Sequence, residues 1–231
     1  MGTKVTKRLF ERVSSEEATR LFSSLGFVES EAGAFRRDCG DVLHGFGFTP
    51  NPSFTRFHVP VGVDVPALVS RSDYIDFAGA HYATLIVSHW LGEFKPFQRQ
   101  SDIYYHFATV EEMRGKFPKV YTDFIEQAEP WLARLRSIDA VADEFHKWRI
   151  APLSTGEVRP PDPFAWALYG WLLQEAGHRE EASEWLSRAL AELRRPKYMK
   201  AGQIVAKGTR GFRLIPPSDP ERRLQELLEK E

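Results

Sequence analysis

Residues 25–48, LGFVESEAGAFRRDCGDVLHGFGF, indicate that the protein contains an antiparallel sheet. The segments AFRR and DVLHGFGF are rich in aromatic and aliphatic residues, which favour strands. Asp38 and Gly40 lie between these segments on either side of Cys39, and both are typical turn residues. We therefore predict a β-hairpin whose turn contains the only cysteine of the chain.

A cysteine at this place could be a nucleophile if a histidine lay beside it and its thiolate were stabilised. Asp38 and Asp41 flank Cys39 and disfavour the thiolate, while Arg36 and Arg37 offset them only in part. No local signature of a cysteine-enzyme family surrounds it. We therefore interpret Cys39 as a turn residue rather than a catalytic one.

A helix is predicted before the hairpin. Ser14 and Glu17 have the spacing of a capping box, and Gly26 stands where a C-terminal glycine ends a helix. Apolar residues recur at helical spacing between them, namely Ala18, Leu21, Phe22 and Leu25.

Further strands are predicted after the hairpin. Residues 54–65, FTRFHVPVGVDV, alternate so that one face of a third strand is expected to be buried and the other partly exposed. The segments ATLIVSHWL, residues 83–91, and DIYYHFA, residues 102–108, can extend the same sheet.

From residue 109 the apolar spacing becomes helical. Thr109 and Glu112 form another capping-box pair, and Pro118 suits the first turn of a helix. Pro130 lacks an N–H and crowds the preceding turn, so we expect a kink there.

The chain is expected to divide at residues 151–163. This segment, APLSTGEVRPPDP, contains four prolines and one glycine, which is the composition of a linker. Two helical patterns follow it and meet at Gly177, and residues 218–231 have the pattern of an amphipathic helix.

The predicted fold class is therefore α+β. Residues 1–150 are expected to form a mainly antiparallel sheet backed by helices, and residues 164–231 a helical hairpin, a basic segment and a C-terminal helix.

Composition and charge narrow the function classes. The chain has 231 residues, of which 42% are hydrophobic and 27% charged, and its net charge of −1 attracts neither nucleic acid nor anionic lipid. The first residues have charges scattered through them, whereas a signal peptide needs an uninterrupted apolar run. The longest apolar run of the chain, residues 83–87, is far shorter than the ~20 residues of a membrane helix. We expect a soluble cytoplasmic protein without a membrane partner.

Residues 10–148 resemble a bacterial family known as domain of unknown function 4304. The resemblance lies in the order of elements and in the phrases LFSSLGF, GAFRRDCGDVLHGFGF, FTRFHVPVGVDV and FPKVYTDFIEQAEPWLARLRSIDAV. It implies an α+β domain with a sheet backed by helices, and it carries over no activity and no functional residues. The stretch ALVSRSDYIDFAGAHYATLIV departs from the family pattern, which leaves the strand order there open.

The segment after the linker is similar to a single tetratricopeptide repeat. The residues at that repeat's spacings are Trp166, Gly170, Gly177, Ala182, Leu186 and Ala189. Small residues at these positions let two antiparallel helices approach closely. Because repeat function needs at least ~3 units, we expect a helical hairpin docked on the first domain rather than a peptide-binding groove.

One group of polar side chains could form a binding surface. Arg56 and His58 share a face of the third strand, and Tyr104 shares a face of its segment with His106. If these strands are neighbours, the four side chains gather, with Arg36 as a further member. Arg56 could then bind an anion or a carboxylate while His58 or His106 responds to pH. A solvated sheet face, or a contact with the second domain, is the alternative interpretation.

Residues 194–213 contain basic side chains and no acid: Arg194, Arg195, Lys197, Lys200, Lys207, Arg210 and Arg213. Tyr198 and Phe212 lie among them, a combination that suits single-stranded nucleic acid. We prefer an electrostatic contact with the acidic residues of the helix before this segment.

No metal or cofactor motif is recognisable. The seven histidines lack the H-E-x-x-H spacing, and Pro50 stands where a dinucleotide loop would have its third glycine. We expect no cofactor, no metal and no catalytic residue.

The sequence thus favours a noncatalytic protein that binds another protein or a small ligand, with a regulatory or toxin-neutralising role as one form. Two alternatives remain: an enzyme of unrecognised, hydrolase-like type that uses the surface of Arg56, His58, Tyr104 and His106, and a weak nucleic-acid binder through residues 194–213.

Overall fold

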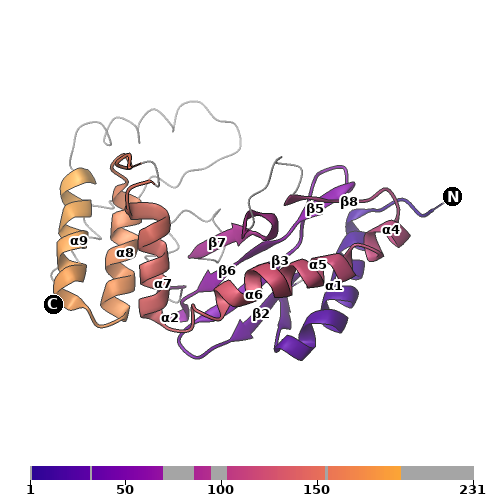
Figure 1. The fold of residues 1–231 in the computed structure, drawn as a ribbon, viewed down its shortest axis with the longest axis horizontal. Helices are drawn as coiled ribbons and strands as arrows, with labels where there is room; N and C mark the ends of the chain where they lie inside the picture. Colours follow the sequence, from indigo (N-terminus) through magenta and orange to yellow (C-terminus); the bar gives the residue numbers. More distant parts are fainter. Residues whose placement is uncertain (1, 32, 70–85, 95–102, 154–155, 194–231) are drawn as a thin grey trace. The chain divides into compact units, whose positions relative to one another are not determined.

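The computed structural model describes residues 2–31, 33–69, 86–94, 103–153 and 156–193, and it shows an α+β protein (Figure 1). The chain divides into two compact units, one of Met1–Asp64 with Leu85–Arg136 and one of Val65–Thr84 with Ser137–Glu231. The sequence suggests a division at the proline-rich segment 151–163, whereas the packing assigns helix α7 (Ile138–Phe145) to the second unit.

The first unit is built on a five-stranded antiparallel sheet. Its strands, in spatial order, are β1 (Val28–Glu31), β2 (Ala34–Asp38), β3 (Leu43–Gly47), β6 (Pro60–Asp64) and β7 (Val87–Trp90). The predicted hairpin is confirmed, because Ala34 pairs with Gly47 and Asp38 with Leu43. Gly40 closes the turn with a φ of 89°.

The expected third strand is two strands in two sheets. Strand β5 (Arg56–His58) pairs with β4 (Thr49–Pro50) and β8 (Tyr105–His106) in a small sheet, whereas β6 belongs to the large one. Pro60 explains the break, since proline is tolerated at the first residue of a strand and cannot donate to a ladder.

The prediction of a partly exposed face is correct for β5 but wrong for β6. Arg56 and His58 are half-buried, whereas Gly62 and Asp64 are buried together with the valines between them.

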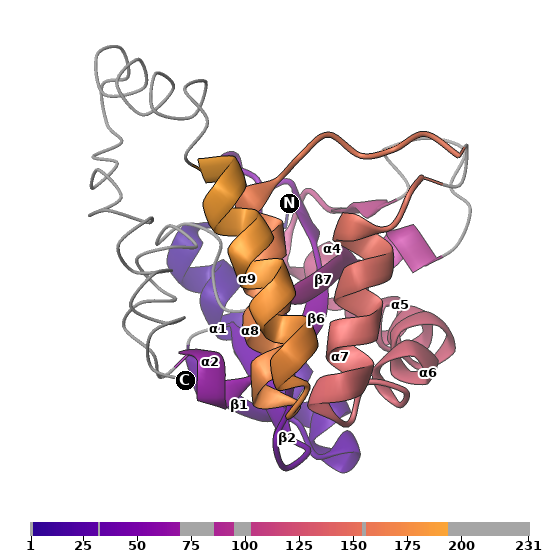
Figure 2. The ribbon, with the colours of Figure 1, turned by 90° about the vertical axis from the view of Figure 1, so that its left-hand side faces the viewer.

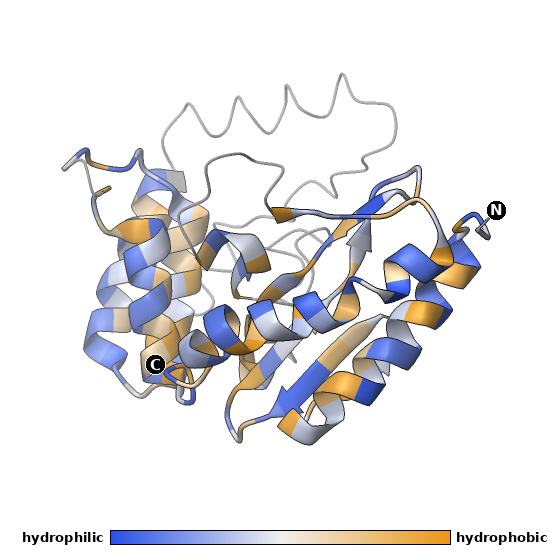
Figure 3. Cartoon of the chain, turned by 45° about the vertical axis from the view of Figure 1, so that its right-hand side comes forward, coloured by the Kyte–Doolittle hydropathy of each residue, from blue (hydrophilic) through white to orange (hydrophobic). Residues whose placement is uncertain are grey.

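Helices lie on one face of the large sheet (Figure 1). They are α1 (Lys7–Phe22), α4 (Val110–Arg114), α5 (Phe117–Asp123) and α6 (Glu129–Leu132), with a 3₁₀ turn η2 (Leu91–Phe94) after β7. Phe46 of β3 points into this layer, with its ring centroid 4.6 Å from that of Phe22 and 5.3 Å from that of Phe124. Figure 3 shows apolar and polar residues mixed along these helices, as expected for helices with one buried face.

Helix α1 begins earlier than the sequence indicates. Its N-cap is Thr6, so Ser14 and Glu17 lie inside the helix and the capping box predicted there is wrong. Residues three apart share one face of any helix, so the same spacing also occurs in helix interiors. The predicted end is confirmed by a 3₁₀ turn, η1 (Ser23–Leu25), followed by Gly26 at a φ of 83°.

The N-cap at Thr109 is confirmed, since its hydroxyl accepts the N–H of Glu112 at 3.2 Å, but the Glu112 carboxylate accepts the N–H of Ala108 at 2.7 Å rather than that of Thr109. The missing N–H of Pro130 is accommodated by a π-helical turn, η4 (Phe124–Ala128). In this turn the N–H of Glu129 donates to the carbonyl of Phe124, five residues earlier.

The second unit contains the predicted helical hairpin. Its elements are α2 (Pro66–Val69), α7, a π-helical turn η5 (His146–Ile150), α8 (Pro163–Glu175) and α9 (Arg179–Leu193) (Figure 2). Asp162 caps α8, and Gly177 joins it to α9 with a φ of 92°. Gly170 allows close packing, because a Cβ built there would lie 2.8 Å from Leu186 Cγ. The predicted helix at 218–231 lies outside the described residues.

Candidate functional site

The structure brings together four of the five predicted binding residues. Strands β5 and β8 are neighbours, and Arg56 lies directly opposite His106. Arg56, His58, Tyr104 and His106 thus gather on one face of the small sheet, together with Trp90 from the end of β7. We call these five residues the Arg56 surface.

Aromatic rings hold the Arg56 guanidinium in place. Its Cζ atom lies 4.4 Å from the centroid of the Tyr104 ring, within the range of a cation–π contact. The His58 ring lies between two others, with its centroid 4.8 Å from Trp90 and 5.6 Å from Tyr104. Planar rings and one stacked cation are therefore arranged side by side.

Arg56 supplies a positive charge that has no acidic partner among the residues that the structure describes. Its Nε atom is buried without a hydrogen-bond partner. Burial lowers the pKa of His58 and the nearby Glu93 carboxylate raises it only in part, so His58 is neutral near pH 7. The surface can therefore accept an anionic group at Arg56 and a flat group against its rings.

The remaining predicted residues are not part of this surface. Arg36 lies on β2 of the large sheet, where it pairs with Val28 and Gly45. The seven basic residues of 194–213 lie outside the described part of the chain. Sequence reasoning missed Trp90, although it lies in a predicted strand, because the register that brings it to His58 is a tertiary property.

Cys39 and His44 form a contact that the sequence did not predict. The Cys39 Sγ atom lies 3.5 Å from Nδ1 of His44, which is fully buried. The other ring nitrogen, Nε2, donates to the carbonyl of Leu135 at 2.7 Å, so Nδ1 is the acceptor. The only local signal was that the hairpin register places both residues at the same end of the sheet.

Arg37 occupies the same acceptor nitrogen. It donates to His44 Nδ1 at 2.9 Å and to Glu129 Oε1 at 2.8 Å. Burial lowers the pKa of His44, and the cations of Arg37 and Arg136 lower it further, against the opposing effects of Leu135 and Glu129. His44 is therefore a weak base for the Cys39 thiol.

The buried His44 predicts a loss of stability in acid. Because the pKa of His44 in the folded protein lies below the unfolded value of 6.5, its contribution to the free energy of unfolding is present above about pH 6.5 and is lost as the pH falls through the folded pKa. Urea unfolding between pH 7.5 and 5 should therefore show a free energy of unfolding that decreases with falling pH, and we call this dependence the pH slope. His44→Gln retains a donor toward Leu135 and should flatten the slope, and an unchanged slope would contradict the assignment.

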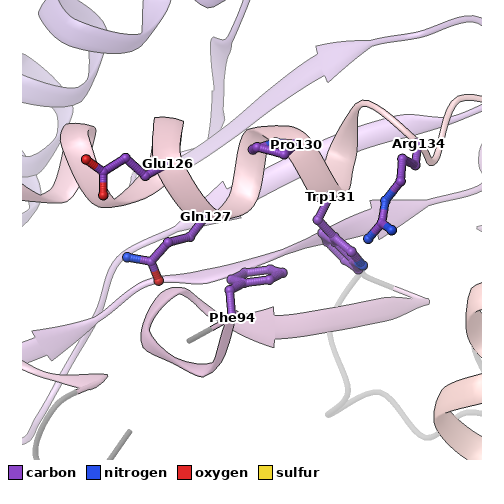
Figure 4. Close-up of a pocket in the computed structure, with 6 residues that line it drawn as sticks. All are labelled: Phe94, Glu126, Gln127, Pro130, Trp131 and Arg134. Atoms are coloured by element: carbon purple, nitrogen blue, oxygen red, sulfur yellow. The ribbon is translucent and has the colours of Figure 1, made fainter. Parts of the chain in front are cut away.

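A hollow lies beside the π-helical turn η4 (Figure 4). It has a volume of about 430 Å³ and is lined by Phe94, Glu126, Gln127, Pro130, Trp131 and Arg134. The rings of Phe94 and Trp131 have centroids 5.2 Å apart, and Gln127 Oε1 is buried without a hydrogen-bond partner. Figure 4 shows Gln127 and Trp131 on the side of the helix that faces Phe94, while Glu126 points away.

Within the described ranges, no group of three or more His, Cys, Asp or Glu side chains is arranged to hold a metal ion. None of the helices in these ranges has the length and apolar character needed to cross a bilayer. Comparison with protein-family models, curated proteins and solved structures found no match to this chain.

Proposed function

We propose that the chain is a noncatalytic cytoplasmic interaction protein whose Arg56 surface receives an acidic segment of a partner protein. The observation that carries this proposal is the stacked guanidinium of Arg56, which is held over Tyr104 without a carboxylate partner in the described chain. A regulatory or toxin-neutralising role is one form of such a function. The proposed relation to domain of unknown function 4304 contributes no functional residues, so the argument rests on geometry.

Two properties of the surface support a protein segment as the ligand. The side chains of Arg56, His58 and Tyr104 are half-buried, so they offer contact area at little cost in conformational entropy. Tyrosine, tryptophan and arginine are the residues enriched at the energetic centres of protein interfaces. An acidic residue beside an aromatic one would meet both the cation and the rings.

The test is the binding of a peptide, acetyl-Glu-Glu-Tyr-Glu-Glu-amide, measured by titration calorimetry at low salt. We expect Arg56→Ala to weaken binding about tenfold or more, since a hydrogen bond to a charged group contributes about 1.5–3 kcal/mol. Arg56→Lys should recover only part of the affinity because lysine lacks the planar fork.

Arg36→Ala is the matched control, because it removes the same charge from a strand of the other sheet. Arg36→Ala should leave the affinity for the peptide unchanged. Replacement of the peptide's four glutamates by glutamines should abolish its binding. Equal losses of affinity in the Arg36 and Arg56 variants would show that net charge alone accounts for the binding. In a native lysate, the partner should be recovered by the wild type and by Arg36→Ala but not by Arg56→Ala.

An enzyme of hydrolase type is the second candidate, and the contact of Cys39 with His44 is the observation that favours it. A thiol nucleophile needs a base that takes its proton. His44 suits this role poorly, because Arg37 already donates to Nδ1 and burial lowers the pKa of the ring. The binding function therefore has the stronger support.

A further inference from the structure

Strand β8 lies at the edge of the small sheet and carries part of the Arg56 surface (Figure 1). The strands that the structure describes follow the order β4, β5, β8, so β8 has a strand neighbour on one side only. An edge strand presents backbone N–H and C=O groups on its outer side, where another chain can pair with them. His106, at the end of β8, is exposed.

The register of the small sheet determines which backbone groups of β8 point outward. Arg56 lies opposite His106, and the N–H of Phe107 donates to the carbonyl of Thr55 at 2.9 Å. In an antiparallel pair, residues that bond to the neighbouring strand alternate with residues whose N–H and C=O point away from it. Since Phe107 bonds to the β5 segment, the N–H and C=O of His106 point away from β5. The other side of β5 agrees, because the carbonyl of Arg56 accepts the N–H of Asn51 at 3.0 Å.

The two outward groups of His106 have no hydrogen-bond partner in the described ranges of the chain. The next outward donor along the segment is already used, since the N–H of Ala108 donates to Glu112 Oε2 at 2.7 Å. The free part of the edge is therefore short and includes His106. One residue of an added strand could exchange two hydrogen bonds with His106.

The side chain of Arg56 leaves its own strand and reaches toward this edge. Its Cζ atom lies 4.4 Å from the ring centroid of Tyr104, which belongs to the β8 segment. An added strand would run about 4.8 Å beyond β8 and would place every second side chain on the face of the Arg56 surface. A glutamate beside Tyr104 would then point its carboxylate toward the guanidinium.

The opposite face of β8 has a different character. Tyr105 and Phe107 point to that side, and both are buried in the aromatic core. Alternate side chains of an added strand would border this apolar region. The edge therefore suits a segment in which acidic and apolar residues alternate.

We propose that the acidic partner segment binds to the Arg56 surface as an added β-strand that pairs through its backbone with His106. The inference rests on the proposed function, because the charge of Arg56 selects the acidic side chains. Backbone pairing supplies affinity in this mode of recognition, and the alternating side chains supply specificity.

The first test uses the peptide acetyl-Glu-Val-Glu-Val-Glu-Val-amide and two N-methylated forms of it, titrated into the full chain by calorimetry. One form carries methyl groups on the three glutamate nitrogens and the other on the three valine nitrogens. A methyl group removes the donor and blocks the approach of a neighbouring strand. With the glutamates on the face of Arg56, their N–H groups face β8, so methylated glutamates should weaken binding about tenfold or more. Methylated valines should leave the affinity close to that of the unmodified peptide.

The second test changes the protein. His106→Pro removes the outward N–H at an edge position, where proline is tolerated, and should weaken binding of the unmodified peptide about tenfold. His106→Ala is the matched control, because it removes the same side chain and keeps the N–H, and it should retain most of the affinity. In the wild type, saturating peptide should slow hydrogen exchange at the His106 amide and leave the already bonded Ala108 amide unchanged.

Equal affinities of the two methylated peptides would overturn the added strand, as would unchanged binding in His106→Pro. The proposed function survives either result if the unmodified peptide binds and Arg56→Ala weakens it, and it fails if no acidic peptide binds. A dimer of the free chain that His106→Pro dissociates would assign the edge to a second copy and would also overturn the proposal. Should His106→Pro fail to fold, the methylated peptides decide the matter.

Discussion

Replacement of Gly170 by leucine is expected to disrupt the helical hairpin of the second unit. A Cβ atom at this position would lie 2.8 Å from Leu186 Cγ and 3.2 Å from the carbonyl oxygen of Ala182. The backbone of α9 cannot yield to a larger side chain without separating from α8, so we expect a loss of about 3 kcal/mol or more. Urea unfolding followed by far-ultraviolet circular dichroism would measure it.

Gly170→Ala tests the same contact with a smaller change. Overpacking should lower the free energy of unfolding by about 1–3 kcal/mol. The better helix propensity of alanine should offset up to about 1 kcal/mol of this loss. Leu186→Ala removes the side-chain atoms nearest to Gly170, so Gly170→Ala should cost less in that background. The double variant should therefore lose less free energy of unfolding than the sum of the two single variants. Strict additivity would show that the helices do not approach as closely at Gly170 as described.

Phe46→Ala is expected to destabilise the first unit strongly. The fully packed ring of Phe46 has five aromatic neighbours within 6 Å between centroids, namely Phe22, Phe27, Phe35, Phe48 and Phe124. Truncation removes these contacts and leaves a cavity, at a cost of about 3–5 kcal/mol. Hydrogen exchange of the amides of β2 and β3 would report the loss.

Two variants calibrate this result. Phe46→Leu keeps most of the apolar volume and should cost clearly less than the alanine variant. Val28→Ala, at a side chain that is 69% exposed in the same sheet, should change the unfolding free energy by no more than about 0.5 kcal/mol. Similar losses at Phe46 and Val28 would contradict the central place of Phe46 in the core.

Much of the fold follows from local chemistry. The β2–β3 hairpin was predictable because turn residues and aromatic strands lie next to each other in the sequence. The same holds for the cap at Thr109 and for the turn between α8 and α9, where Gly177 adopts a φ of 92°. In each case the deciding interactions join residues a few positions apart.

Errors arose where one local pattern is compatible with two structures. The spacing of Ser14 and Glu17 is that of a capping box, yet it lies inside α1 because Thr6 provides the cap. The alternation of residues 54–65 is continuous, yet Pro60 divides it between two sheets. Burial of a second face, as at Gly62, depends on what packs there and leaves no mark on strand periodicity.

The candidate sites show the same division. Side-chain alternation was enough to place Arg56 with His58, and Tyr104 with His106, on shared faces, because the period of a strand is a local property. The meeting of the two strands, the arrival of Trp90, the contact of Cys39 with His44 and the outward direction of the His106 backbone groups depend on register and packing between segments distant in the chain. Backbone periodicity and turn chemistry are short-range and readable along the chain, whereas these contacts result from the burial of apolar surface in three dimensions, which many registers could satisfy and only the assembled core selects.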